Sequence, residues 1–148
     1  MKIGERIKYF RKLRNLTQKE LGLLMGYEEN TASARIFQYE SGVRNPTKET
    51  LIKLADIFGI SRYVFEVQDL TSELVLIHVL FDLENIWDVD IKQIDSYFSM
   101  QFQDEEAINP TLFNHLSAWR EMKEKYKKGE ITAEDYNEWK NTYSGIKN

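Results

Sequence analysis

LTQKELGLLMGYEENTASARIFQYESGVRNP, residues 16–46, decides the fold of this chain. Thr17 and Glu20 have the spacing of a capping box, in which the Thr17 hydroxyl accepts a backbone proton and Glu20 reaches back to the cap residue. A helix is therefore expected from Thr17 to about Gly26. A second helix is expected over 32–40, because Gly42 suits the left-handed residue that closes many helices. The stretch predicts two short helices separated by a turn.

Further short helices are predicted on both sides of this pair. Apolar residues at every third or fourth position, with Lys and Arg around them, predict a basic amphipathic helix over 3–13. Pro46 forces an extended step before a fourth helix, which ends at Gly59. Ser61 can cap a fifth helix over 62–65. Five short helices thus make up the first part of the chain.

The remainder is predicted to be a small α+β arrangement of a helix, a β-hairpin and two helices. The helix over 72–83 is apolar on all sides, and such a helix must be covered on more than one side, so we expect a partner subunit as its second cover. Alternating, strand-favouring residues predict a hairpin of strands 88–92 and 97–102. A helix from Pro110 to Lys128 follows, and Thr132 caps the last one.

Charge is divided unevenly along the 148 residues. Residues 1–70 carry 12 Lys and Arg against 9 Asp and Glu (+3), whereas residues 71–148 carry 8 against 15 (−7), which together give the net charge of −4. Such asymmetry indicates modules with different partners. We expect a mainly α protein with one domain over 1–68 and a second, dimerisation or regulatory, domain over 69–148.

Several classes of protein are disfavoured by the sequence. The chain has no cysteine, which excludes a disulfide scaffold, a Cys-based zinc site and a thiol nucleophile, and fits a cytoplasmic protein. The longest apolar run, 74–81, is far short of a membrane span. His78 and Asp82 lie four residues apart, but no third metal ligand is apparent. We expect no metal, no cofactor, no membrane association and no enzymatic activity.

Three segments, 16–22, 35–46 and 51–61, resemble the Cro and lambda-repressor type of helix-turn-helix transcription regulators, also called the xenobiotic-response-element family. The resemblance covers about residues 3–66, and the three motifs occur in the family's order and spacing. It implies a lambda-repressor-like five-helix domain that binds double-stranded DNA.

The resemblance also implies roles for individual residues. Gln18 corresponds to a glutamine that binds backbone phosphate and braces the recognition helix. Ser33, Ala34 and Gln38 occupy positions whose counterparts reach base edges. Gln38 can donate and accept at an adenine or bind phosphate. The expected recognition helix is therefore 32–40.

Arg44 and Lys48 match positions where the family touches the phosphate backbone. Arg11 and Glu40 occupy the positions of a buried ion pair between the first helix and the end of the recognition helix, so we expect them to be structural. Three further basic side chains can add to the positive charge: Lys2, Arg6 and Lys8.

One departure from the family concerns the segment between Gly26 and Ile36, which is several residues longer than in the shortest members. The extra residues either lengthen the turn or extend the recognition helix, which leaves the base-reading residues uncertain by one helical turn. Asn30, Thr31 and Arg35 therefore stay candidates for DNA contacts.

Together these features predict a sequence-specific transcriptional regulator, a repressor that binds a palindromic operator as a homodimer. The alternative is an antitoxin or partner-sensing regulator whose C-terminal domain binds another protein. A protein or small-molecule effector at the C-terminal domain is left open by the sequence.

Overall fold

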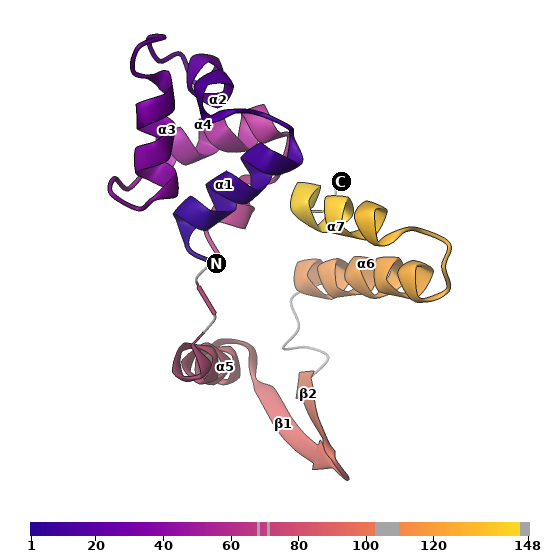
Figure 1. Cartoon of the computed structure of the whole chain (residues 1–148). Helices are drawn as coiled ribbons and strands as arrows, with labels where there is room; N and C mark the ends of the chain where they lie inside the picture. The colour runs from indigo at the N-terminus through magenta and orange to yellow at the C-terminus, as the bar shows by residue number, and fades with distance from the viewer. Residues whose placement is uncertain (68, 71, 103–109, 146–148) are drawn as a thin grey trace. The chain divides into compact units, whose positions relative to one another are not determined.

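The computed structural model describes residues 1–67, 69–70, 72–102 and 110–145 (Figure 1). These residues form seven α-helices, one 3-10 helix and one antiparallel hairpin, which confirms the predicted mainly α fold class. The first elements are α1 (Ile3–Leu13), α2 (Gln18–Leu24), α3 (Ala32–Glu40), α4 (Lys48–Phe58) and η1 (Arg62–Phe65). The later ones are α5 (Glu73–Trp87), β1 (Val89–Ile94), β2 (Tyr97–Phe102), α6 (Pro110–Lys127) and α7 (Ala133–Thr142).

The chain divides into two compact units. We call Met1–Asp69 with Asn137–Ser144 the N-terminal unit, and Leu70–Tyr136 with Gly145–Asn148 the C-terminal unit. The two units do not test the domains expected over 1–68 and 69–148, so those domain boundaries remain a prediction. In the described part of the chain, no helix has the length and apolar character needed to cross a membrane.

Local capping signals set the ends of the N-terminal helices. The Thr17 hydroxyl accepts a proton from the Glu20 backbone at 3.1 Å, and the Thr17 backbone donates to the Glu20 carboxylate at 2.7 Å, so the predicted capping box is confirmed. Thr47 caps α4 by accepting from the Thr50 backbone. Gly59 ends α4 with φ of 64°, a left-handed value that glycine adopts at no steric cost.

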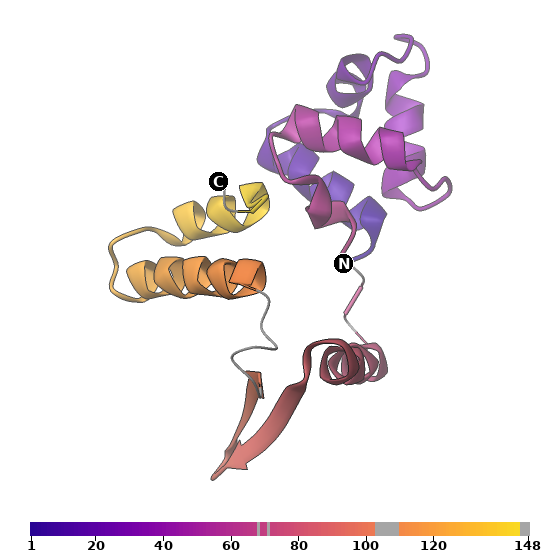
Figure 2. The same ribbon diagram turned by 180° about the vertical axis from the view of Figure 1, so that it is seen from behind.

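The core of the N-terminal unit lies between α1, α2, α3 and α4, and Figure 2 shows these helices from behind. Ile7, Leu21, Ile36 and Leu54 are completely buried there. Each buried side chain of this size contributes about 1.5–3 kcal/mol of transfer free energy. Because Ile36 fixes which side of α3 faces the core, the opposite side of α3 is left at the surface.

The second half of α7 also belongs to the N-terminal unit. Arg14 donates to the Glu138 carboxylate at 2.7 Å and to the Phe58 carbonyl at 2.7 Å. The Ser61 backbone donates to the Asn141 carbonyl at 2.8 Å. The last described helix therefore contacts the ends of α1 and α4.

In the C-terminal unit, α5 is four residues longer at its C-terminal end than the predicted helix over 72–83. It ends at Asp88, whose φ of 49° is left-handed and breaks the helical backbone. The hairpin is confirmed, but β1 extends two residues beyond the predicted strand over 88–92, so that Ile94 lies opposite Tyr97 across the turn. That turn has only two residues, and Asp95 supplies its positive φ of 52°.

The capping signal of α7 is confirmed as well. The Thr132 hydroxyl accepts from the Asp135 backbone at 3.0 Å, and the two side chains are also hydrogen-bonded. Tyr136 accepts a hydrogen bond from the Trp119 indole at 2.8 Å and stacks on Tyr126. Even so, no described residue of α5, the hairpin, α6 or α7 is buried, so these elements lack a core of their own.

Candidate nucleic-acid interface

The two central helices, α2 and α3, touch backbone to backbone at Gly22. A Cβ atom at Gly22 would lie 2.5 Å from the Ala32 carbonyl oxygen and 2.7 Å from its Cα, which no real side chain tolerates. Glycine at this position therefore allows the two helices to cross closely. The contact lies at the first residue of α3 and so fixes where that helix begins.

The extra residues before α3 lengthen the turn and do not extend the helix. The Glu28 carbonyl accepts from the backbones of Thr31 and Ala32 at 2.9 and 2.8 Å, and α3 begins at Ala32. From α4, the Lys53 ammonium donates to the Met25 carbonyl at 2.8 Å. The question left open by the sequence is thus resolved: the turn runs from Met25 to Thr31.

Tyr27 packs this turn against α3. Its hydroxyl lies 3.2 Å from the Tyr39 hydroxyl, and its backbone donates to the Gly22 carbonyl at 3.0 Å. Burial, reinforced by the hydrogen bond with Tyr39, raises the pKa of Tyr27 to about 12. The Arg35 guanidinium lies 6.0 Å from the Tyr27 ring, a cation–π distance. The turn therefore has a defined, packed conformation.

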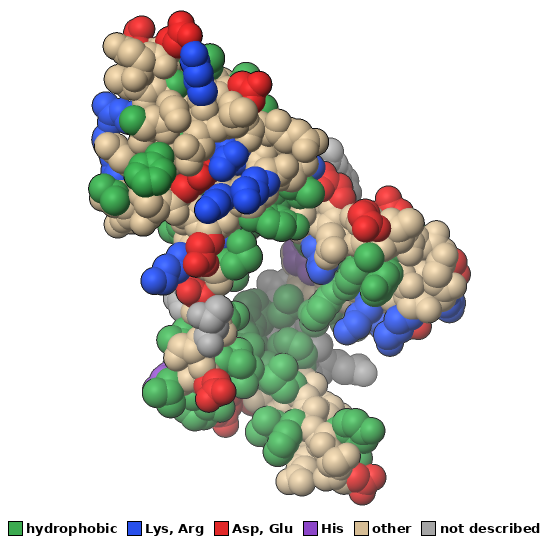
Figure 3. Space-filling view, in the orientation of Figure 1, with side chains coloured by type: hydrophobic (Ala, Val, Ile, Leu, Met, Phe, Trp, Pro, Cys, Tyr) green, Lys and Arg blue, Asp and Glu red, His purple; other side chains and the backbone are tan. Residues whose placement is uncertain are grey.

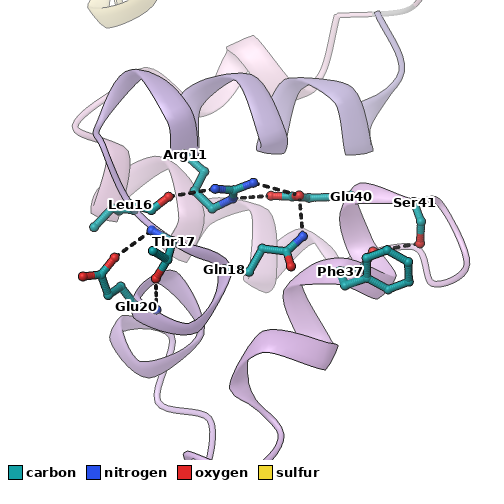
Figure 4. A network of polar contacts seen from close by, with 8 residues as sticks. All are labelled: Arg11, Leu16, Thr17, Gln18, Glu20, Phe37, Glu40 and Ser41. Atoms are coloured by element: carbon teal, nitrogen blue, oxygen red, sulfur yellow. Dashed lines mark hydrogen bonds and ion pairs between the residues drawn. The ribbon is translucent and has the colours of Figure 1, made fainter.

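Below the turn, a buried polar network joins α1, α2 and α3 (Figure 4). The Arg11 guanidinium donates to both oxygens of the Glu40 carboxylate, at 2.5 and 3.1 Å, and to the Leu16 carbonyl at 2.7 Å. The Gln18 amide donates to the same carboxylate at 2.8 Å. These contacts give Arg11 and Glu40 the arrangement expected of a structural pair, and they give Gln18 the bracing contact.

The outer face of α3 is the exposed surface that this scaffold presents. Ser33, Ala34 and Phe37 are exposed and Gln38 is half-buried, whereas Ile36 on the other side is buried. The outer face of α3 thus combines hydroxyl, methyl, phenyl and amide groups without a charge.

Phe37, whose side chain is 56% exposed, is absent from the residues expected to contact DNA. The helical spacing that buries Ile36 and Tyr39 also places Phe37 beside Ser33 and Ala34, which are four and three residues earlier. The signal was therefore present in the sequence. A large apolar side chain on an outer face is usually assigned to the core, which explains the omission.

The remaining expected contacts lie around this face. Asn30 and Thr31 are exposed in the turn, and Arg35 is half-buried against Tyr27. Arg44 is exposed in the loop after α3, where its backbone donates to the Gln38 carbonyl at 3.1 Å. Lys48, the first residue of α4, is also exposed.

The basic residues of α1 divide into two groups. Lys2 and Lys8 are exposed. Arg6 is half-buried and donates to the Val64 carbonyl at 2.5 Å, which ties α1 to η1. Arg6 thus has a structural contact that the sequence did not predict. No three metal-ligating side chains gather within the described ranges.

Part of the N-terminal unit matches a known protein family. Residues 7–65 match the family model described as Helix-turn-helix. The solved structure of transcriptional regulator BswR is 24% identical to this chain with a TM-score of 0.43, and the alignment covers 60% of this chain and 97% of that one. Among curated proteins, no significant match to the chain was found.

Residues 7–65 are therefore a helix-turn-helix domain of the Cro and lambda-repressor type, and this segment contains both α2 and α3. The match spans the whole network of Arg11, Gln18 and Glu40 and the outer face of α3. It supports a DNA-binding transcriptional regulator, a class of protein that is generally not enzymatic.

Proposed function

We propose that this protein is a sequence-specific repressor that binds a palindromic operator as a homodimer. The outer face of α3 carries this proposal, because it is exposed, uncharged and held at a fixed angle to α2 by Gly22 and the Arg11 network. In helix-turn-helix proteins such a face enters the major groove. A dimer that covers its operator blocks a promoter without needing a further activating surface.

Base reading falls to the outer face of α3 in this proposal. Gln38 offers an amide that can donate and accept at an adenine, and Ser33 offers a hydroxyl. Ala34 and Phe37 offer apolar contacts to thymine methyl groups. Asn30, Thr31 and Arg35 would act at the edge of this surface, since they lie in or beside the turn.

Phosphate binding falls to groups around that face. Arg44 and Lys48 are exposed on either side of Pro46 and supply positive charge. The Gln18 amide uses one hydrogen on Glu40 and retains a second for a phosphate oxygen. These residues would fix the register of α3 without reading sequence.

Dimerisation is needed because one unit carries little charge. Residues 1–70 have a net charge of only +3, so each copy can neutralise few phosphates. Two copies on half-sites about 34 Å apart would double the contacts. The acidic excess of residues 71–148 would limit non-specific binding.

The test is selection of DNA from a random pool, followed by gel shift over a range of salt concentrations. We expect an enriched inverted repeat, and affinity that falls linearly with salt on logarithmic axes. A reporter placed behind the selected operator should be silenced. No enriched motif, with binding insensitive to salt, would contradict the proposal.

A second candidate function is an antitoxin or partner-sensing regulator, which the exposed apolar residues of α5 and the hairpin favour. In it, another protein or a small-molecule effector binds the C-terminal unit. Capture experiments with the full chain distinguish the two: a repressor dimer recovers only itself. The cytoplasmic location belongs to both proposals, because operator DNA is the ligand.

A further inference from the structure

The β-hairpin has one apolar and one polar face. Its register places Ile91 opposite Met100 and Gln93 opposite Phe98, so these side chains share a face with Val89 and Phe102. That face, which we call the apolar hairpin face, carries no ionisable group. The opposite face holds Asp90, Lys92, Ile94, Tyr97, Ser99 and Gln101.

Much of the apolar hairpin face is exposed in the described part of the chain, although Val89 and Phe102 at its open end are half-buried. Ile91, Phe98 and Met100 are all exposed, and Figure 3 shows hydrophobic side chains on the hairpin surface. An isolated two-stranded hairpin is at best marginally stable in water and needs a hydrophobic face packed against another element. Within the described ranges, no helix covers the exposed part of this face, so it needs a further cover.

Helix α5 also has an exposed apolar surface. Leu74, Ile77 and Phe81 recur at steps of three and four and form an exposed apolar stripe, which we call the α5 stripe. On the other side of α5, Val79 and Leu83 are half-buried within the unit. Because α5 has apolar residues on both sides, it needs a second cover.

We propose that the α5 stripe of one copy packs on the apolar hairpin face of a second copy, and the reverse, in a two-fold symmetric dimer. The inference rests on the homodimer of the proposed function and assigns its surface. In a two-fold interface the same contact forms twice, once in each direction. The α5 stripe and the apolar hairpin face of each copy are therefore both covered by the other copy. A cover with the required chemistry is thus present in the chain itself.

The area involved is sufficient for a stable dimer. Large apolar side chains have on the order of 200 Å² each to bury. The exposed fractions of the six exposed apolar side chains in the two patches amount to roughly 700 Å² per copy: Leu74, Ile77, Phe81, Ile91, Phe98 and Met100. A standard interface buries about 800 Å² per partner. The absence of charge on the apolar hairpin face also favours a second copy over nucleic acid or a charged protein.

Phe98 and Tyr97 provide a matched pair for the test, because both side chains are 72% exposed and they lie on opposite faces of the hairpin. We expect the wild-type chain to sediment as a dimer at micromolar concentration. Phe98→Glu should raise the dimer dissociation constant by at least about 30-fold, the size of an interface hot spot. Tyr97→Glu should change it by less than about threefold, as for a residue outside the hot spot.

Three results would overturn the proposal: a wild-type monomer, a dimer that survives Phe98→Glu, or equal disruption by Tyr97→Glu. A wild-type monomer that captures another protein would assign the surface to that protein instead. Far-ultraviolet circular dichroism of both variants checks folding, because a substitution at an exposed position should leave the helical signal unchanged.

The reciprocal geometry has a separate test, since the chain has no cysteine. Chains carrying Ile77→Cys and Met100→Cys are tagged differently, co-expressed and treated with a short bis-maleimide. We expect cross-linking between the two variants to exceed that within either one. Equal cross-linking of Ile77→Cys chains to each other would show that α5 pairs with α5 and would overturn the proposed contact.

Failure of this inference is distinguishable from failure of the proposed function. A monomer that still binds a selected operator would overturn the interface and leave DNA binding intact. A dimer disrupted by Phe98→Glu, with no DNA selected, would support the interface and contradict the repressor.

Discussion

Arg11 and Glu40 form a buried bidentate ion pair that joins α1 to the C-terminal end of α3. Nε of Arg11 lies 2.5 Å from Oε1 of Glu40, and Nη2 lies 3.1 Å from Oε2. Their side chains are only 11% and 4% exposed. Because Gln18 donates to the same carboxylate, the pair sets the position of α3 relative to both preceding helices.

Replacing Arg11 with Met should therefore destabilise the N-terminal unit. Removal of one partner leaves the Glu40 carboxylate buried without its cation, which costs about 3–5 kcal/mol. The free energy of unfolding in urea measures the loss. Lys12→Met, at the exposed neighbouring position, should change it by less than about 0.5 kcal/mol.

The double variant Arg11→Met with Glu40→Met tests the mechanism. A buried ion pair replaced by apolar side chains is often neutral, so the double variant should regain most of the lost stability. A single variant as stable as wild type, or a double variant less stable than the single one, would contradict an energetic role for the pair.

Gly22→Ala should separate α2 from α3. The new methyl group would meet the Ala32 backbone at 2.5 Å, and backbone atoms yield less readily than side-chain ends. We expect a loss of about 1–3 kcal/mol in the free energy of unfolding, measured in urea. Leu23→Ala, at an exposed position one residue along, is the control. Wild-type stability in Gly22→Ala would show that the crossing is looser than the structure has it.

Tyr27→Phe should alter the stability of the protein at alkaline pH. The folded state raises the Tyr27 pKa from 10.0 to about 12, so the unfolded chain releases this proton at lower pH. Stability from the neutral phenol is complete below pH 10 and lost as pH rises towards 12. Wild-type free energy of unfolding should thus fall more steeply than that of Tyr27→Phe across this window.

Denaturant midpoints between pH 9 and 12, about the span of tyrosine titration, provide the measurement. Tyr9→Phe, at an exposed tyrosine of α1, is the control and should parallel wild type. Parallel curves for Tyr27→Phe and wild type would contradict the link between the turn and this hydroxyl.

Features that depend on neighbours in sequence could be predicted from the chain alone. The caps at Thr17 and Thr132, the end of α4 at Gly59 and the two-residue turn at Asp95 all follow from side chains within three or four positions. The core-facing side of α3 followed equally from its helical period. Local chemistry thus determined the framework of the candidate interface.

Features that depend on distant residues could not be predicted in the same way. A longer turn and a longer α3 fit the sequence equally well, and the choice involves Lys53 of α4, which binds the Met25 carbonyl. The sequence indicated only that Arg6 adds positive charge, whereas in the fold it donates to the Val64 carbonyl, 58 residues away. Polar residues at 84 and 85 interrupt the apolar pattern, so the sequence predicted the end of this helix at 83 and missed the last turn of α5.

Phe37 should read thymine methyl groups. In the selected operator, thymine is replaced by uracil one position at a time, which removes only a methyl group. Wild-type affinity should fall about fourfold, or roughly 0.8 kcal/mol, at the base that Phe37 contacts. Phe37→Ala should bind thymine and uracil operators equally, as measured by fluorescence anisotropy.

Tyr63→Ala is the control for loss of an exposed aromatic ring outside α3, and it should keep the uracil effect. If Phe37→Ala retained the full uracil effect, a different residue would contact the methyl group, with Ala34 on the same face as the first candidate.

Gln38 and Arg44 should have separable effects on DNA binding. Gln38→Ala removes a base contact, so it should cost about 1–3 kcal/mol at one operator position and relax specificity there. Arg44→Ala removes a phosphate contact, so it should weaken all sequences alike and lower the logarithmic salt slope by about one. Gel shifts with operator variants at several salt concentrations measure both. The reverse pattern would show that α3 lies in the groove with its other end towards the bases.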